Sequence, residues 1–264
     1  MKILISIIVP TYNSIATIDT CLNSITKQTF TNLEVVIVDG ASSDGTDNFI
    51  KTFANKDNRI VWVSKRDKGI YDAMNKGVEL CNGDWVLFLG SDDYLHDIRV
   101  LEDISFFLQK TSADIVYGDA ILISNKERYG GQFDILRLHI LNNLCHQTIF
   151  YRRSIFNKLG KYNLSYPIYA DWDFNIRCFR HTEIKTQYIQ RDIVVFNNLT
   201  GVSSLPHEDS FLKEIPVSYI KELNTLKREN KELLNSRPYI IGNSIYNAIK
   251  KVGVVAFMNK LRKT

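Results

Sequence analysis

Residues 3–13 read ILISIIVPTYN, and residues 33–45 read LEVVIVDGASSDG. Each stretch is a short apolar run, rich in β-branched residues, that ends in polar and turn-forming residues. Runs of this kind indicate buried strands that are followed by loops. Two further runs have the same character. We therefore predict four strands in the first half of the chain, at Ile3–Val9, Leu33–Val38, Ile60–Val63 and Asp84–Leu89.

Helical patterns separate these strands, at about 15–27, 46–54 and 71–81. Continuous apolar strands that alternate with helices are typical of a parallel sheet covered on both faces. Functional side chains of such sheets gather at the carboxyl ends of the strands. The expected fold class is α/β, with a Rossmann-like, mostly parallel central sheet flanked by helices.

The pattern becomes mixed after residue 93. We expect a helix at 97–110, strands at 114–117, 120–124, 128–133 and 146–151, a helix at 169–180 and a strand at 186–196. We expect one domain at 1–212, with a nucleotide-binding half at about 1–95 and an acceptor half at about 96–212. Residues 213–264 form a helical and basic C-terminal extension, with a charged helix at 216–236.

Charge is unevenly distributed along the 264 residues, whose net charge is +4. From Arg237 onward there are six basic and no acidic residues, which leaves 27 basic against 29 acidic residues before it. This balance argues against a nucleic-acid footprint on the main domain. The tail carries apolar residues at helical spacing, so it either lies on an anionic membrane surface or packs on the body or on a second subunit of a homodimer.

The four cysteines are scattered and form no CxxC pair, which indicates a reducing compartment. No stretch approaches the roughly 18 consecutive apolar residues of a membrane-spanning helix. The apolar run at the N-terminus lacks a following cleavage site and is better interpreted as a strand. We expect a cytoplasmic protein, peripheral on the inner face of the cytoplasmic membrane if the tail binds lipid.

Two adjacent carboxylates, Asp92 and Asp93, follow the strand at 84–89 in the sequence FLGSDD. Buried together they would be unfavourable without compensation. A divalent cation that bridges them to phosphate oxygens would compensate their charge. The alternative is that one of them caps the next helix. Carboxylate ligands do not distinguish Mg²⁺ from Mn²⁺.

Four motifs occur in order: PTYN at 10–13, DGASSDG at 39–45, DKGIYDAMNKG at 67–77 and GSDD at 90–93. Their order and spacing resemble the large family 2 of inverting glycosyltransferases, whose fold is called GT-A. The resemblance covers about residues 3–200. It implies metal-dependent transfer of a sugar from a nucleotide-diphosphate donor, with a UDP-sugar favoured. The implied acceptor is a saccharide or a lipid-linked saccharide, as in bacterial surface polysaccharide assembly.

The resemblance also implies roles for individual residues. Asp93 is the expected direct metal ligand, with Asp92 facing the ribose or a metal-bound water. Asp39 would accept a hydrogen bond from the imide N–H of a pyrimidine such as uracil. Ser42 and Asp44 are equally compatible with turn formation and helix capping. The residues expected to bind the donor are Thr11, Tyr12, Asn13, Asp39, Ser42, Asp67, Gly69 and Asp92.

The sequence YADWDF at 169–174 begins a predicted helix. An inverting transfer needs a carboxylate that takes the proton of the acceptor hydroxyl. The family often has Glu-Asp at such a helix start, and this chain has Ala170-Asp171. Asp171 therefore aligns as the general base, with Asp173 as its competitor. Both carboxylates would also favour a helix N-terminus for electrostatic reasons alone.

Three further residues are expected near the acceptor or in a closing loop. Trp172 either stacks on a sugar or only packs. The resemblance implies that His146, beside Gln147, faces the acceptor or the donor sugar, whereas the alternative is an ordinary histidine whose hydrogen bonds are satisfied within the protein. Gly201 would be the hinge of a loop that closes over the diphosphate.

Two other function classes fit the sequence less well. A nucleotidyltransferase would normally carry a Gly-rich, basic loop after the first strand, and PTYN is not one. A non-catalytic sugar-nucleotide-binding or scaffold protein would be expected to lose the metal or base carboxylates, which are all present.

Overall fold

The computed structural model describes residues 3–140, 142–200 and 209–215, and the single positions 225, 228, 231 and 232. The chain divides into two compact units, Met1–Lys213 and Glu214–Thr264. The expectations for Gly201 and for the basic tail lie outside the described residues, as does all of the helix expected at 216–236 except the four single positions. Among the described residues, no helix has the length and apolarity needed to cross a membrane.

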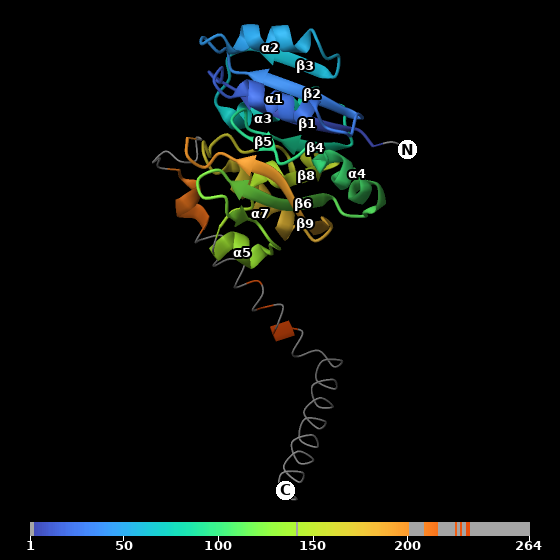
Figure 1. Ribbon diagram of the computed structural model, residues 1–264. Coiled ribbons are helices and arrows are strands. Elements are labelled where there is room, and N and C mark those ends of the chain that lie inside the picture. The colour runs from blue at the N-terminus through green and yellow to red at the C-terminus, as the bar shows by residue number, and fades with distance from the viewer. Residues whose placement is uncertain are drawn as a thin grey trace, which may run out of the picture. The chain divides into compact units, whose positions relative to one another are not determined.

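The first unit is built on one mixed sheet, shown in Figure 1. In the described residues its strand order is β3-β2-β1-β4-β8-β6-β9-β5, and β7 pairs with β6. The four predicted strands of the first half are present and parallel, so this part of the fold prediction is confirmed. Their bounds are Ile5–Thr11 (β1), Leu33–Asp39 (β2), Ile60–Ser64 (β3) and Trp85–Phe88 (β4).

The register of these strands brings their carboxyl ends to one edge. Thr11 of β1 pairs with Asp39 of β2, which pairs in turn with Ser64 of β3. On the other side of β1, Ile8 pairs with Phe88, the last residue of β4. The chain order of the strands reverses between β1 and β4, and ligands of open α/β sheets bind at such a switch point.

The second half extends the sheet from β4. Strand β8 (Ile149–Arg152) runs antiparallel between β4 and β6 (Ile115–Leu122). Strand β9 (Thr186–Phe196) runs parallel to β6, and the short β5 (Tyr94–Leu95) pairs antiparallel with β9. These pairings place the start of β8 and the end of β9 beside the residues that follow β4.

Four strand predictions in this half were wrong in detail. The strands expected at 114–117 and 120–124 are one strand, β6, whose register shifts around Asp119. The strand expected at 128–133 is only Arg128–Tyr129 (β7), because the chain turns at Gly131, where φ is +84° and the backbone N–H donates to Asp119. The strand expected at 146–151 begins with a 3₁₀ turn, His146–Thr148 (η1), and becomes extended at Ile149.

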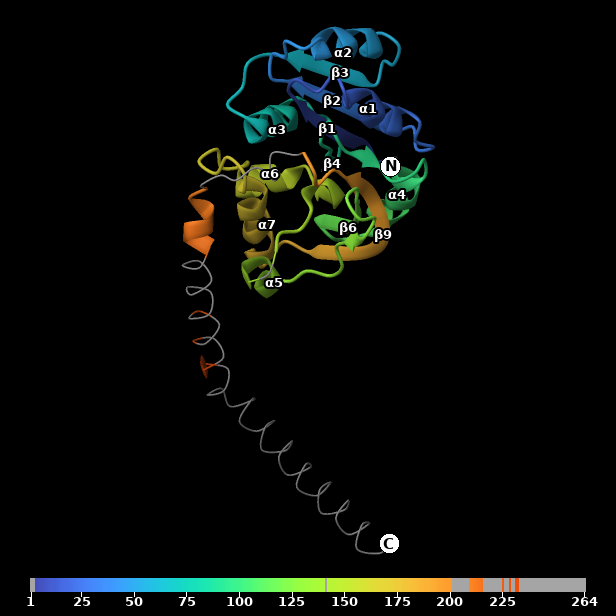
Figure 2. The same cartoon turned by 60° about the vertical axis from the view of Figure 1, so that its left-hand side comes forward.

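Helices cover both faces of the sheet (Figure 2). Helices α1 (Ile18–Thr26), α2 (Thr46–Ala54) and α4 (Val100–Lys110) pack on the face that carries the odd-numbered residues of β1. The opposite face carries α3 (Ile70–Leu80), α6 (Ser154–Leu159) and α7 (Ala170–Arg180). Helix α6 and the short α5 (Ile135–Ile140) were not predicted.

The two faces have different cores. The face under α1 and α4 is mostly aliphatic, with Trp85 and Phe150 among its buried residues, whereas the other is dominated by aromatic rings from β4, β8 and the helices. Phe156 and Phe174 stack there with ring centroids 5.0 Å apart, and Phe88 meets Phe156 edge-on. All four cysteines are free and buried, as the sequence predicted.

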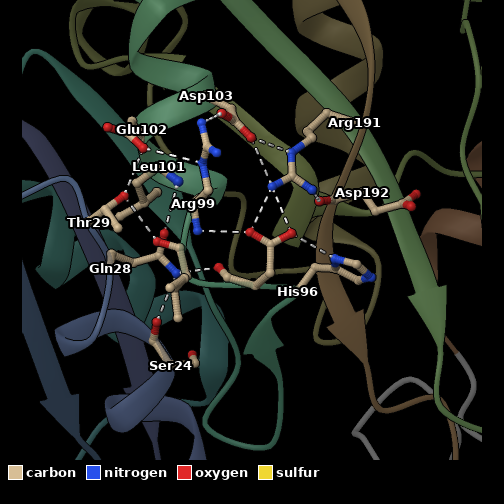
Figure 3. A network of polar contacts seen from close by, with 12 residues as sticks. Ser24, Gln28, Thr29, His96, Arg99, Leu101, Glu102, Asp103, Arg191 and Asp192 are labelled. Carbon is tan, nitrogen blue, oxygen red and sulfur yellow. Dashed lines mark hydrogen bonds and ion pairs between the residues drawn. The ribbon is translucent and has the colours of Figure 1, made fainter.

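A polar network joins the two halves (Figure 3). The buried Gln28, just beyond α1, accepts a hydrogen bond from the backbone N–H of Leu101 at 3.0 Å and donates to the backbone oxygen of Asp97 at 2.6 Å. Arg191 of β9 forms ion pairs with Asp97 at 2.8 Å and with Asp103 at 3.1 Å. The network therefore ties β9 to the start of α4 and to the end of α1.

Gly77 allows α3 to lie close against β1, because a Cβ atom there would be 2.3 Å from Cγ2 of Ile8. We expect Gly77→Ala to lower the free energy of unfolding in urea by about 1–3 kcal/mol through overpacking. The loss should occur although alanine favours the helix by about 1 kcal/mol. Leu80→Ala, on the same helix but 44% exposed, is the control with little change. Equal stability of Gly77→Ala and the wild type would contradict this packing.

Candidate active site

Asp93 lies where three strands meet, at the end of β4, the start of β8 and the end of β9. Its side chain is only 1% exposed. One carboxylate oxygen, Oδ1, accepts a hydrogen bond from the backbone N–H of Asn197 at 2.7 Å. The other, Oδ2, accepts one from Nε2 of Gln147 at 2.9 Å. Asp92 accepts a longer bond, 3.2 Å, from the side chain of Asn197.

The acidic pair is electrostatically strained. Burial, and then the charge of Asp92, raise the pKa of Asp93 to about 7. Burial also raises the pKa of Asp92. Within the described residues, neither carboxylate forms an ion pair with a lysine or arginine. Gly90 is required beside them, because a Cβ atom there would lie 2.5 Å from Oδ2 of Asp93.

The donor atoms of this pair fit a hard divalent cation. Magnesium-type sites commonly use one or two carboxylates and complete their coordination with substrate phosphates and water. In the part of the chain that the structure describes, no three His, Cys, Asp or Glu side chains converge to hold a metal by themselves. A cation held by Asp92 and Asp93 would therefore share its coordination shell with a ligand.

The ends of β1 and β2 present groups suited to a ligand. Oγ1 of Thr11 is buried and has no hydrogen-bond partner among the described residues. Tyr12 is 64% exposed, although it directly follows a fully buried strand. The ring of Tyr12 and Oδ2 of Asp67 both approach Gly40, within 3.2 Å and 2.9 Å of where its Cβ atom would be. Together they form a surface on which a flat, polar ligand can lie.

Asp39 is fully buried below this surface. Its carboxylate accepts hydrogen bonds from the backbone N–H and the hydroxyl of Ser42 and from the hydroxyl of Ser64. Asp39 thus holds the loop after β2 in place, and its direct contact with a base stays a prediction.

The loops after β1 and β2 are hydrogen-bonded to each other. Asn13, at a φ of +49°, accepts from the backbone N–H of Ser43 and donates its own backbone N–H to Oγ of Ser42. Asp44 accepts from the backbone N–H groups of Ile15 and Thr46. Ser42 and Asp44 therefore hold the two loops together, and Asp44 bonds the first residue of α2, although the N-cap of that helix is Gly45, which makes no side-chain cap hydrogen bond. Their direct contact with the donor stays a prediction.

The loop after β3 is shaped by Gly69, whose φ of +113° and ψ of 177° are almost restricted to glycine. Its backbone N–H donates to Oδ1 of Asp67 at 2.9 Å, and α3 begins at the next residue. This conformation directs Asp67 toward Gly40 and Tyr12.

Asp171 lies in the first turn of α7 and is 7% exposed. Its carboxylate accepts hydrogen bonds from the hydroxyl of Tyr71 at 2.7 Å and from the amide of Asn143 at 2.8 Å. The single Tyr71 proton is shared, because the same hydroxyl lies 2.5 Å from the backbone oxygen of Ile168. Nδ1 of His146 lies 3.1 Å from the same carboxylate. Burial, and then the charge of Asp171, raise the pKa of Tyr71 well above its ordinary value, so that this hydroxyl remains a donor.

The neighbours of Asp171 on the helix have other partners. Asp173 pairs with Arg177 at 2.9 Å, one turn along α7. The indole N–H of Trp172 donates to the backbone oxygen of Leu138 at 2.7 Å, and its ring packs against those of Tyr169 and Phe211. The structure thus separates Asp171 from both of these candidates.

The turn η1 connects the two acidic centres through consecutive residues. His146 contacts Asp171, and Gln147 donates to Asp93. The sequence analysis assigned no site role to Tyr71, Asn143 or Asn197, and it placed Gln147 only beside His146, facing the acceptor or the donor sugar. Tyr71 lies inside the third motif and could have been found there. Asn143 and Asn197 are placed by pairings between distant strands and carry no local signal.

Comparison with known proteins agrees with this geometry. Residues 6–173 match the model of Glycosyl transferase family 2. A "PGL/p-HBAD biosynthesis glycosyltransferase" of Mycobacterium tuberculosis is 44% identical over 215 residues, which are 81% of this chain and 84% of that protein. A second such protein, from Mycobacterium bovis, shows the same identity and coverage.

Solved structures show the same fold. The structure of S. aureus TarS residues 1–349 with UDP-GlcNAc matches with a TM-score of 0.65 and 22% identity, over 88% of this chain and 67% of that one. The mannosyltransferase PcManGT from Pyrobaculum calidifontis, in complex with GDP-Man and Mn²⁺, matches with a TM-score of 0.58 and 18% identity, over 73% and 56%.

The GT-A-like α/β fold expected from the sequence is therefore confirmed. The acidic pair, the polar strand ends and the buried Asp171 all lie within the segment that the family model matches. The chain belongs to Glycosyl transferase family 2 and is a glycosyltransferase that uses a nucleotide-sugar donor.

Proposed function

We propose that this glycosyltransferase moves a sugar from a UDP-sugar to a hydroxyl of a saccharide or lipid-linked saccharide, with inversion at the anomeric carbon. The observation that carries the proposal is the pair of acidic centres joined through η1. One is a carboxylate pair suited to a cation and a diphosphate, and the other is a single buried carboxylate surrounded by donors. This division of roles fits direct displacement, which needs charge stabilisation on one side and a base on the other.

In this proposal Asp93 and Asp92 hold a divalent cation, Mn²⁺ or Mg²⁺, which when bound neutralises the charge that develops on the departing diphosphate. Tyr12 and Asp67 contact the nucleoside across Gly40, and Thr11, whose hydroxyl is buried and has no partner among the described residues, lies against it. The complex of TarS with UDP-GlcNAc favours a uridine nucleotide. The complex of PcManGT with GDP-Man makes a guanosine nucleotide the alternative to test.

Asp171 takes the proton from the acceptor hydroxyl. Tyr71 and Asn143 fix its carboxylate from two sides, which orients the remaining lone pairs. Asp209 holds the start of α7 by accepting from the backbone N–H groups of Ile168 and Tyr169. A base held this firmly contributes by orientation as well as by proton transfer.

The acceptor is proposed from two indications. The mycobacterial relatives are named for PGL/p-HBAD biosynthesis, so a biosynthetic acceptor is expected here too. The excess of basic residues after Arg237 fits an acceptor presented at an anionic membrane surface.

The donor class can be read from thermal shifts with UDP-, GDP-, dTDP- and CMP-sugars, each with and without Mn²⁺. A ligand that binds only the folded state raises the melting temperature according to its affinity. We expect stabilisation by UDP-sugars that depends on Mn²⁺ and is lost in Asp93→Ala. Metal-dependent stabilisation by another nucleotide class alone would reject the uridine donor, and no shift with any sugar nucleotide would reject the donor site.

The general base can be assigned by comparing Asp171→Asn with Asp173→Asn. Water serves as acceptor, and the release of UDP from a UDP-sugar is measured. Asp171→Asn should reduce the rate by about 10²–10⁴-fold, the usual contribution of general-base catalysis, while Mn²⁺-dependent binding of UDP is retained. Asp173→Asn should have a small effect, because this carboxylate pairs with Arg177. The reverse order of effects would assign the base to Asp173.

The acidic pair predicts a pH-dependent stability of the metal-free protein. Asp93 has a pKa of about 7 in the folded chain, against an ordinary value of 3.8. The folded state therefore holds a proton that the unfolded state has lost, and this stabilisation disappears as the pH rises from about 4 through 7. In EDTA, the unfolding free energy of the wild type should fall relative to that of Asp93→Asn over this interval. A constant difference would contradict the raised pKa.

A further inference from the structure

We propose that Gln147 is a positioning residue that orients the Asp93 carboxylate for metal binding. The inference rests on the proposed role of Asp93 as a metal ligand. It adds a residue that contacts neither the donor nor the acceptor in the proposal above. It also gives the turn η1 a function beyond connecting α5 to β8.

The geometry of Gln147 is specific. Its side chain is 6% exposed, and its Nε2 is 2.9 Å from Oδ2 of Asp93. A carboxylate only accepts hydrogen bonds, so the amide nitrogen must face it. The thiol of Cys145 donates to Oε1 of Gln147 at 3.2 Å and holds the amide from its other end. Burial raises the pKa of Cys145, so the thiol keeps its proton and remains a donor.

Gln147 supplies a side-chain hydrogen bond that orients the Asp93 carboxylate. The other oxygen of Asp93 is bound by the backbone N–H of Asn197, which no ordinary substitution removes. With one donor on each oxygen, the carboxylate plane is fixed and the second lone pair of each oxygen is left for a cation. Outer partners of this kind commonly change metal affinity or activity by about 10–100-fold when they are removed.

The same turn also sets the distance between metal ligand and base. His146, the preceding residue, contacts Asp171 at 3.1 Å. A displaced Gln147 would therefore move Asp93 relative to Asp171. In-line displacement depends on this relation, because the leaving diphosphate and the attacking hydroxyl must lie on opposite sides of the anomeric carbon.

The test is a titration of the full-length protein with MnCl₂ in saturating UDP, with free Mn²⁺ followed by electron paramagnetic resonance. Gln147→Met keeps the approximate shape but removes the donor, and should weaken Mn²⁺ binding by about 10–100-fold. Gln147→Asn keeps the amide on a side chain one methylene shorter and should give an intermediate loss. Melting curves establish that each variant is folded. If Gln147→Met does not fold, Gln147→Asn decides.

Gln28→Met is the matched control. Gln28 is equally buried, at 5% exposure, and makes side-chain amide hydrogen bonds to the backbone in the network that joins α1 to α4. The Gln28→Met variant should have a lower melting temperature and an unchanged Mn²⁺ affinity. If folded Gln147→Met binds Mn²⁺ as tightly as the wild type, the role of Gln147 is overturned while the metal site stands. The same holds for Gln147→Asn if Gln147→Met does not fold. An equal loss of Mn²⁺ affinity in Gln28→Met would also overturn the role of Gln147. No Mn²⁺ binding by the wild type would overturn the metal site itself, and this inference with it.

Discussion

The burial of Asp93 beside the half-buried Asp92, after the end of β4, is the constraint on which the site depends. Asp92 and Asp93 repel each other in a setting with little water, and in the described residues no cationic side chain pairs with them. Among the described residues, three hydrogen bonds from neutral donors partly compensate this charge, one from Gln147 and two from Asn197. The arrangement is unfavourable for stability and suited to binding, because a cation and a diphosphate would find preoriented ligands.

The rest of the sheet holds the residues around the acidic pair in place. Parallel pairing of β1, β2 and β3 aligns Thr11, Asp39 and Ser64 at one edge. The antiparallel β8 and the long β9 then bring η1 and Asn197 to the same edge from the second half of the chain. The network around Gln28 and Arg191 holds β9 against α4. The two halves are also in direct contact, because Tyr71 of α3 bonds to Asp171 of α7.

The first half of the fold could be predicted from sequence because each of its strands is a local apolar run that ends in a polar motif. The helix at 46–54 and the strand at 186–196 were predicted with the bounds that the structure shows. The 3₁₀ turn at His146 could not be predicted, since its conformation is set by bonds to Asp93 and Asp171, which are 54 and 25 residues away. The split of β6 was wrong because Gly118 and Asp119 resemble a turn locally, whereas pairing of Asp119 and of the residues on either side with β9 continues the strand through a shift in register. Candidate residues could be predicted where they lie in a sequence motif. Their hydrogen-bonding partners could not, because the fold brings those residues in from distant parts of the chain.

The central claim is that the buried acidic pair holds a metal ion against the donor diphosphate. Its most direct test is the anomalous scattering of crystals grown with MnCl₂ and UDP, measured near the manganese absorption edge. We expect a single strong peak after the end of β4, within coordination distance of the Asp93 carboxylate and of a phosphate oxygen of UDP, and beside the carboxylate of Asp92. Density for UDP at the strand ends with no manganese peak beside Asp93, or with a peak elsewhere, would contradict it.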